Sequence, residues 1–406
     1  MPKISRMDQF LSDRIKKLSE SQTIAMARRS RELQAEGIDV ISLSLGEPDL
    51  NAPDHVKEAA IKAIQEDWSH YPPVAGYPEL RQAISDKFKR QNGLDYKAEQ
   101  IVVSTGAKQS LANVILSLVN PGDEVIILAP YWVSYLELVK LAGGKARYIT
   151  AGIETDFKSS AAELDEAINE DTKLIIFSSP SNPTGSFYTK EELQGFAQVI
   201  ARHPKVFAIA DEIYEHLNFE GEHQSLAQFP EVYNQVITVN GVSKAYAMTG
   251  YRIGYIGAPT WIAKACDKMQ GQITSGANSI AQRAAIAALE TPKDWLNEMA
   301  DIFKKRRELV TELFSEIEGL KTNMPGGAFY LFPEVTELFG HSFNGQEVNN
   351  ANDLCMYFLN ECHVAMVPGE AFGAPGYVRL SYATSESNLK EAARRIKVGV
   401  EKLLHH

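Results

Sequence analysis

Short apolar runs rich in valine and isoleucine recur along the chain before Thr291, and each is bounded by proline, glycine, asparagine or aspartate. This pattern predicts buried β-strands at residues 40–45, 125–128, 174–177, 206–210 and 236–239. The stretches between them have helical apolar spacing, for example residues 111–119 and 189–201. Helices that alternate with nearly continuous apolar strands favour a mostly parallel sheet covered on both faces. The sequence therefore predicts an α/β domain.

The pattern changes after Thr291. A long charged helix is predicted over residues 295–320. It is followed by predicted strands at residues 328–332, 364–367 and 377–381 and predicted helices at residues 351–360 and 386–404. Near the start of the chain, the segment from Ser19 to about residue 35 is predicted to be helical. We therefore expect an N-terminal arm that includes part of the small domain (1–45), a large domain (46–294) and a smaller α+β domain (295–406).

Length and charge narrow the class of protein. A chain of 406 residues is too long for one ordinary hydrophobic core, which agrees with more than one domain. The formal net charge of −11 disfavours nonspecific binding to nucleic acids or to anionic membranes. No apolar run reaches membrane-spanning length, and residues 1–20 lack the apolar core of a signal peptide. We expect a cytoplasmic protein that binds neither nucleic acid nor membrane.

The cysteines and histidines do not favour a metal site. Cys266, Cys355 and Cys362 include no Cys-x-x-Cys pair, and scattered cysteines are typical of buried thiols in a reducing compartment. His216 and His223 lack the spacing of metal ligands. We therefore expect no bound metal.

The first candidate for chemistry is Asp211, which directly follows the apolar run 206–210. A carboxylate is thus predicted at the C-terminal end of a parallel strand, the edge at which open α/β sheets bind ligands. Taken alone, an aspartate at this point is more often a helix cap or a turn residue. Tyr214 follows three residues later.

The second candidate is Ser243-Lys244, which lies just past the predicted strand 236–239. A single lysine in such a place is usually a solvated surface charge. Here Arg252 follows eight residues later between Gly250 and Gly254. Flanking glycines let backbone pass close to a ligand, and the arginine fork suits a phosphate.

Two further loops follow the same pattern. Asn182 lies in a proline-rich turn after the predicted strand 174–177. Gly106-Ala107-Lys108 precedes a helix predicted to begin near Ser110, and a helix N-terminus after a glycine can bind an anion. Each loop alone is equally explained as an ordinary connection.

Taken together, these motifs resemble the class I aminotransferases of the aspartate aminotransferase kind, which are pyridoxal 5′-phosphate (PLP) enzymes of fold type I. The resemblance runs in order and at the family's spacing from about residue 20 to the end of the chain. It implies the α/β fold of PLP-dependent transferases, with a large domain and a smaller α+β domain. The motifs that carry it are Gly46-Glu47-Pro48-Asp49, Tyr71 to Gly76, Gly106 to Lys108, Pro130-Tyr131-Trp132, Asn182-Pro183-Thr184-Gly185, Asp211 to Tyr214, Ser243-Lys244, Arg252 and Arg379.

The resemblance implies that PLP is the cofactor and assigns residues to its ring. Lys244 would form the Schiff base with PLP and then move a proton during catalysis. Asp211 would keep the pyridine nitrogen protonated, which makes the ring an electron sink. Tyr214 and Asn182 would bind the phenolic oxygen, and Trp132 would stack on the ring.

The resemblance also assigns residues to the phosphate and the substrate. Arg379 would bind the substrate α-carboxylate through two parallel hydrogen bonds, and Gly46 would offer backbone to the same substrate. Tyr71 would reach the phosphate of a neighbouring subunit, which implies a homodimer. The phosphate would be held by the backbone of Gly106, Ala107 and Lys108, together with Ser243 and Arg252.

The implied function is transfer of an amino group between an amino acid and a 2-oxo acid, with aspartate or glutamate as the expected amino acids. Lys108 is the candidate for the second carboxylate, because related enzymes place a lysine there. Prephenate-using relatives carry another lysine in the N-terminal arm, where this chain has Ser19, so aspartate and glutamate are expected over prephenate. The alternatives are activity on prephenate or on aromatic or neutral amino acids, a PLP-dependent lyase of the same fold, and a non-catalytic PLP-binding regulator.

Overall fold

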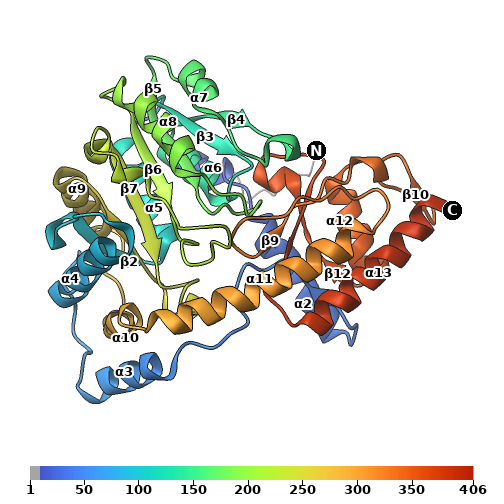
Figure 1. The fold of residues 1–406 in the computed structure, drawn as a ribbon, viewed down its shortest axis with the longest axis horizontal. Helices are drawn as coiled ribbons and strands as arrows, with labels where there is room; N and C mark the ends of the chain where they lie inside the picture. Colours follow the sequence, from blue (N-terminus) through green and yellow to red (C-terminus); the bar gives the residue numbers. More distant parts are fainter. Residues whose placement is uncertain (1–9, 406) are drawn as a thin grey trace.

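A seven-stranded β-sheet lies at the centre of the larger of two domains (Figure 1). The structure is a computed structural model that describes residues 10–405. In spatial order, the strands are β2 (Ile101–Thr105), β8 (Ile253–Gly257), β7 (Val236–Gly241), β6 (Phe207–Asp211), β5 (Thr172–Ser178), β3 (Glu124–Ala129) and β4 (Lys145–Thr150). Only β8 runs against its neighbours in this sheet. The predicted mostly parallel sheet is therefore confirmed.

Helices cover both faces of the sheet because successive strand residues point to opposite sides. In β3, Val125 and Ile127 pack in one core with α5, α6 and α9. Ile126 and Leu128 pack in a second core with α4, α7, α8 and α10. The helices of this domain are α3 (Asp54–Gln65), α4 (Pro78–Lys87), α5 (Ala107–Leu118), α6 (Ser134–Ala142), α7 (Ala161–Ala167), α8 (Lys190–Ala201), α9 (Thr260–Gly271) and α10 (Ser279–Leu289).

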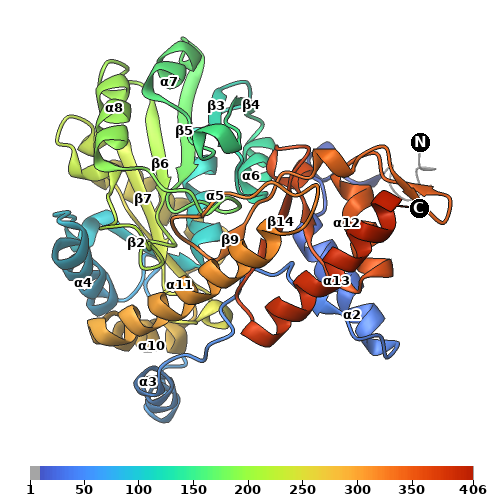
Figure 2. The same ribbon diagram turned by 45° about the vertical axis from the view of Figure 1, so that its right-hand side comes forward.

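The smaller domain combines helices with short strands around its own core. Its elements are α11 (Lys293–Ser315), β9 (Tyr330–Leu331), β10 (Ser342–Phe343), β11 (Gln346–Glu347), α12 (Ala351–Glu361), β12 (Val364–Ala365), β13 (Val367–Pro368), β14 (Val378–Ser381) and α13 (Glu386–His405). The N-terminal elements are α1 (Asp13–Lys16), α2 (Gln22–Ala35) and β1 (Ile41–Ser42). Because β1 pairs in parallel with β12, α2 lies beside the C-terminal elements (Figure 2).

The structure differs from the sequence prediction at several elements. Strands β2, β4 and β8 were not predicted. β4 is an edge strand with mostly exposed side chains, so it lacks an apolar run, and glycines interrupt the apolar pattern of β8. The predicted strand 40–45 is only two residues long, at Ile41–Ser42. Helix α5 begins at Ala107 instead of near Ser110, and α11 ends at Ser315 instead of residue 320.

Two further sequence expectations bear on the class of protein. No helix within residues 10–405 is long and apolar enough to span a membrane. Cys266, Cys355 and Cys362 are buried free cysteines, which confirms the prediction of buried thiols.

Candidate active site

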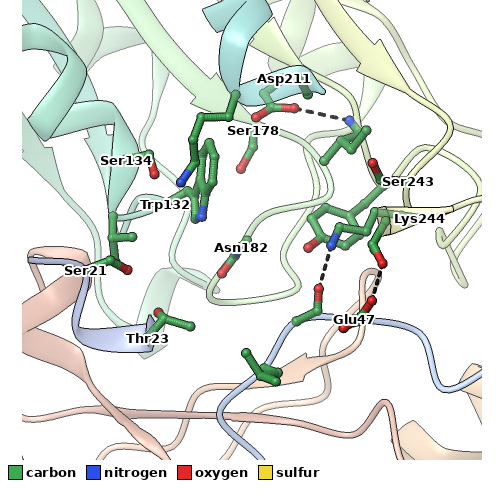
Figure 3. A pocket seen from close by; sticks show the side chains of 18 of the residues that line it. Ser21, Thr23, Glu47, Trp132, Ser134, Ser178, Asn182, Asp211, Ser243 and Lys244 are labelled. Atoms are coloured by element: carbon green, nitrogen blue, oxygen red, sulfur yellow. Dashed lines mark hydrogen bonds between the residues drawn. The ribbon is translucent and has the colours of Figure 1, made fainter. Parts of the chain in front are cut away.

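The candidate residues meet at the C-terminal edge of the sheet (Figure 3). Parallel strands end at one edge, so loops far apart in sequence converge there. β6 ends at Asp211, β7 leads to Lys244, and β5 leads to Asn182. Arg252 reaches the same edge because it directly precedes β8, the strand of opposite direction.

These residues surround a cavity of about 300 Å³. Tyr71 does not line it and is 93% exposed, and Gly106 lies beside it next to Ala107. The predicted residues that line the cavity are Gly46, Ala107, Lys108, Trp132, Asn182, Asp211, Tyr214, Ser243, Lys244, Arg252 and Arg379.

Asp211 is a buried carboxylate held by two donors. The Tyr135 hydroxyl donates to Oδ2 at 2.7 Å, and the backbone N–H of Ile213 donates to Oδ1 at 3.3 Å. Burial raises the pKa of Asp211 to about 6, although both hydrogen bonds work in the opposite direction. A cationic partner in the cavity would therefore be strongly stabilised by this carboxylate.

Lys244 supplies an amine to the same cavity. Its Nζ donates a hydrogen bond to the backbone oxygen of Gly46 at 2.5 Å. Burial lowers the pKa of Lys244 to about 8, and the attraction of Glu47 opposes this shift. About a tenth of the amine is therefore neutral at pH 7, far more than for a lysine in water.

Arg379 is buried, and its neighbours hold its guanidinium group in place. Its Nη1 donates to Oδ1 of Asn182 at 2.8 Å, and its Nη2 donates to the backbone oxygen of Ser44 at 2.6 Å. The rings of Tyr330 and Phe372 lie 4.6 and 4.8 Å from its guanidinium carbon. Its Nε has no hydrogen-bond partner among the described residues. A buried cation with spare donor capacity is suited to a carboxylate ligand.

A second region of positive charge lies at the start of α5. Gly106 caps this helix with a φ of 80°, which favours glycine. A side chain at this position would also collide with the guanidinium of Arg252. The first backbone N–H groups of α5 thus lie close to an arginine, an arrangement suited to a phosphate.

Trp132 and Lys108 lie side by side in the wall of the cavity. The Nζ of Lys108 lies 5.1 Å from the centroid of the Trp132 ring. Burial, and to a lesser degree the charge of Arg252, lower the pKa of Lys108. An anion bound here would relieve the repulsion between these two cations.

Several residues of the cavity were missed by the sequence analysis. Tyr330 and Tyr135 contact Tyr214 and Asp211 through their hydroxyl groups. Glu47, within a motif already singled out, accepts a hydrogen bond from the Thr249 hydroxyl. The resemblance could have drawn attention to Glu47, but neither tyrosine lies in a motif that the sequence analysis used.

The N-terminal arm contributes to the cavity through Ser21, Thr23 and Ile24. Ser19, which the sequence analysis considered, is not among the lining residues. Its backbone N–H instead donates to Oε2 of Glu137 at 2.8 Å and attaches the arm to α6. The arm therefore closes one side of the cavity.

A buried charged cluster lies next to the site. Glu212, Glu215 and His223 place one ligand atom each within 4.8 Å of one another, a proximity that the sequence spacing did not predict. Lys87 forms an ion pair with Glu215, and Asn92 donates to the same carboxylate at 2.7 Å. Burial opposes ionisation, but Lys87 and then His216 hold the pKa of Glu215 well below its usual range. The Lys87 ammonium already balances the Glu215 carboxylate.

Comparison with known proteins identifies the class of enzyme. Residues 38–396 match the family Aminotransferase class I and II. The chain therefore belongs to this family and is an aminotransferase, and PLP is its cofactor, as the sequence analysis expected. The solved structures that it resembles share its fold, so the predicted fold type I architecture is confirmed.

The relatives are similar over nearly their whole length. A probable aspartate/prephenate aminotransferase of Rhizobium leguminosarum bv. phaseoli is 47% identical, over 96% of this chain and 98% of the relative. The aspartate/prephenate aminotransferase of Cereibacter sphaeroides is 45% identical, over 96% of this chain and 98% of the relative. The aspartate aminotransferase structure from Rhizobium meliloti has a TM-score of 0.93 and 42% identity, over 97% and 99%. That of the Thermus thermophilus enzyme with maleate has a TM-score of 0.90 and 39% identity, over 96% and 99%.

The residues of the cavity fit PLP. The start of α5 with Arg252 suits the phosphate, and the buried Asp211 carboxylate suits a protonated ring nitrogen. The buried Lys244 amine suits the carbonyl carbon of the cofactor. These three features come from different strand ends, yet they line one cavity.

Proposed function

We propose that Lys244 holds PLP covalently and is the base that moves the substrate α-proton. The observation that carries this proposal is the buried Lys244 amine in a cavity that also contains Asp211 and Arg379. Burial lowers the pKa of Lys244 to about 8, which agrees with this role. PLP, when bound, supplies a carbonyl carbon that takes up the amino group and a ring that accepts electrons from the substrate. The neutral amine of Lys244 supplies the matching acid–base chemistry.

The other cavity residues orient the reactants. Asp211 holds a proton on the ring nitrogen, and the burial of its carboxylate keeps water from that contact. Tyr214 and Asn182 bind the phenolic oxygen, and Trp132 supplies an aromatic face for the ring. Arg379 binds the substrate α-carboxylate. The backbone of Gly46 lies beside the substrate. The phosphate is held by the backbone of Gly106, Ala107 and Lys108 together with Ser243 and Arg252.

Replacing Lys244 with alanine tests the covalent attachment. The wild-type protein is expected to be yellow, and borohydride is expected to fix the cofactor on the peptide that contains Lys244. The Lys244→Ala variant is expected to lose both the fixed label and turnover. As a control, Lys140→Ala removes a lysine that pairs with Glu137 outside the cavity lining. A label on a peptide that lacks Lys244 would show that the assignment is wrong.

We propose that the substrates are dicarboxylic amino acids, namely aspartate and glutamate, with their 2-oxo acids. The support is Lys108, a second cation in the cavity besides Arg379, close to the Trp132 ring. A side-chain carboxylate at Lys108 and an α-carboxylate at Arg379 would together fix the length of the substrate. Prephenate is the second candidate, because the relatives from Rhizobium leguminosarum and Cereibacter sphaeroides carry it in their names.

Specificity constants separate these candidates. We would measure kcat/KM for aspartate, glutamate, prephenate, alanine and phenylalanine in the wild type, in Lys108→Ala and in the control Lys140→Ala. Loss of one charge-assisted contact is expected to lower the value for aspartate by about 10- to 150-fold and to leave phenylalanine nearly unchanged. Equal losses for aspartate and phenylalanine would show that Lys108 does not bind the side chain. Prephenate as the best acceptor would show that the Ser19 prediction is wrong.

We propose that the enzyme is a homodimer with shared active sites. Tyr71 is 93% exposed and does not line the cavity of its own chain, which agrees with a role in a neighbouring subunit. Ile61 and Ile64 of α3 and Ile273 are also exposed, and a second subunit would cover apolar side chains of this kind.

A complementation experiment tests the sharing directly. Lys244→Ala and Tyr71→Phe are produced separately and then mixed under conditions that exchange subunits. If sites are shared, each mixed dimer regains one site with both native residues, and activity rises above the sum of the two variants. If Tyr71 serves its own chain, mixing restores nothing. A fully active monomer by light scattering at micromolar concentration would also contradict the proposal.

We propose a cytoplasmic location. The three buried free cysteines support it, since unpaired thiols are typical of a reducing compartment. Cell fractionation tests it, and recovery in an oxidising compartment would contradict it.

A further inference from the structure

The Tyr330 side chain lies between Tyr214 and Arg379, two residues of the cavity. Tyr330 belongs to β9 of the small domain and is 1% exposed. Its hydroxyl oxygen is 2.6 Å from that of Tyr214, which belongs to the large domain. Its ring lies 4.6 Å from the guanidinium carbon of Arg379, the group proposed to bind the substrate carboxylate. One side chain thus contacts a group assigned to the cofactor and a group assigned to the substrate.

The position of this hydroxyl is closely constrained. A side chain at position 46 would collide with it, so Gly46 is needed to leave room. Strand pairing fixes the backbone, because Tyr330 is opposite Ser381 and Leu331 is opposite Leu380, next to Arg379. The Tyr214 ring packs edge-on against the adjacent Phe329 at 5.3 Å. The contact between the two hydroxyl groups is therefore part of a packed arrangement.

The direction of the hydrogen bond follows from the chemistry of a phenol. Each hydroxyl has one proton to donate. If Tyr214 donates its proton to the phenolic oxygen of PLP, then Tyr330 has to donate to Tyr214. We infer that Tyr330 is a positioning residue that strengthens the hydrogen bond from Tyr214 to the cofactor and couples it to the charge state at Arg379; this inference rests on the proposed function.

The coupling has an electrostatic cause. The positive charge of Arg379 lies over the Tyr330 ring and makes its hydroxyl a stronger donor. A substrate carboxylate bound to Arg379 cancels part of this charge, and the donor weakens. Because a hydrogen bond to the phenolic oxygen stabilises its unprotonated state, a weaker donor raises the pH at which the cofactor gains a proton. Substrate binding thus changes the ionisation of the cofactor through Tyr330.

The variant Tyr330→Phe tests this role because it keeps the ring over Arg379 and removes only the hydroxyl. Tyr382→Phe is the matched control. Tyr382 is also buried, and its hydroxyl donates to the Ala328 backbone oxygen at 3.3 Å, but it does not line the cavity. The visible absorption of each PLP-containing enzyme is titrated with pH, with and without saturating maleate, a dicarboxylate that has no amino group to transfer.

The expected result is specific to Tyr330. Loss of one neutral hydrogen bond should raise the midpoint of the absorption titration by about half to one pH unit in Tyr330→Phe. The change in midpoint caused by maleate should become smaller in this variant, whereas Tyr382→Phe should match the wild type in both respects. A Tyr330→Phe titration that coincides with the wild type, or a maleate effect of unchanged size, would overturn the inference.

The experiment also separates this inference from the proposed function. If the wild type shows no pH-dependent visible absorption, or if Lys244→Ala keeps it, the proposed attachment of the cofactor fails. If the wild type titrates and only Tyr330→Phe fails to differ from it, the attachment stands and the role of Tyr330 is wrong. If Tyr330→Phe binds PLP too weakly to titrate while Tyr382→Phe binds it normally, then Tyr330 is needed for cofactor binding itself. That result would overturn the inference that Tyr330 only strengthens the hydrogen bond from Tyr214.

Discussion

Replacing Asp211 with asparagine should stabilise the apoenzyme at neutral pH. Burial raises the pKa of this carboxyl from 3.8 to about 6 in the folded chain. The folded chain favours the protonated carboxyl more strongly than the unfolded chain does. The stability of the fold is therefore greatest below pH 3.8, falls as the pH rises, and reaches its lower level above about pH 6. Above that pH, the ionised carboxylate therefore lowers the stability of the apoenzyme by about 3 kcal/mol, at 1.36 kcal/mol per pKa unit.

Asparagine has nearly the same shape and carries no charge. Its oxygen can accept the short Tyr135 hydrogen bond, whereas its Nδ2 cannot accept the longer one from the Ile213 N–H, a loss that does not vary with pH. The stability gained by Asp211→Asn should therefore depend on pH, at about 2 kcal/mol at pH 5 and about 3 kcal/mol at pH 8. The variant should at the same time bind PLP more weakly, because it lacks the charge that pairs with the ring nitrogen.

Urea unfolding of the two apoenzymes at pH 5 and pH 8, at one fixed protein concentration, measures this difference. The exposed residue Asp301 provides a control for loss of one negative charge, as Asp301→Asn. A stability difference between Asp211→Asn and the wild type that is equal at the two pH values would refute the reasoning, as would a less stable variant at pH 8.

Three further predictions follow from single contacts. Arg379→Lys should lower kcat/KM by about 10- to 150-fold because an ammonium group cannot reproduce the fork, and an unchanged value would count against its role. Covalent uptake of PLP by the apoenzyme should accelerate with rising pH and reach half its plateau near pH 8, because only the neutral Lys244 amine reacts; a midpoint near 10.5 would contradict the lowered pKa. Lys87→Met should lower the free energy of unfolding by about 3–5 kcal/mol, because it leaves the Glu215 carboxylate buried without its cation. Urea unfolding measures this loss, and the double variant with Glu215→Leu should recover part of it.

Much of the site was predictable because its chemistry is placed by strand ends. Asp211 follows an apolar run directly, and Lys244 and Asn182 come a few residues after two other runs. Their meeting in one cavity follows from the parallel sheet, so the order of residues was enough to predict it. Arg252 was predicted from its motif alone, because β8 runs in the opposite direction and its glycines hid the strand.

Some elements and contacts leave no pattern in the sequence. The edge strand β4 exposes most of its side chains, so no apolar run marked it. The approach of Glu212 to His223 depends on a turn of the chain that no spacing rule describes. These features depend on exposure and on loop conformation, which the order of residues does not show.

The class of enzyme, the cofactor and the residues at the strand ends were predictable from the order of residues alone, because each depends on local patterns and on motifs in order. The groups that support these residues became apparent from the packing of the chain. Tyr330 reaches Tyr214 across 116 residues of chain, and Tyr135 reaches Asp211 across 76. Neither tyrosine lies in a motif that the resemblance used or carries a chemistry that distinguishes it from a core aromatic. Their roles arise because packing of the two domains, and of α6 against the sheet, brings one hydroxyl within hydrogen-bond distance of a particular partner.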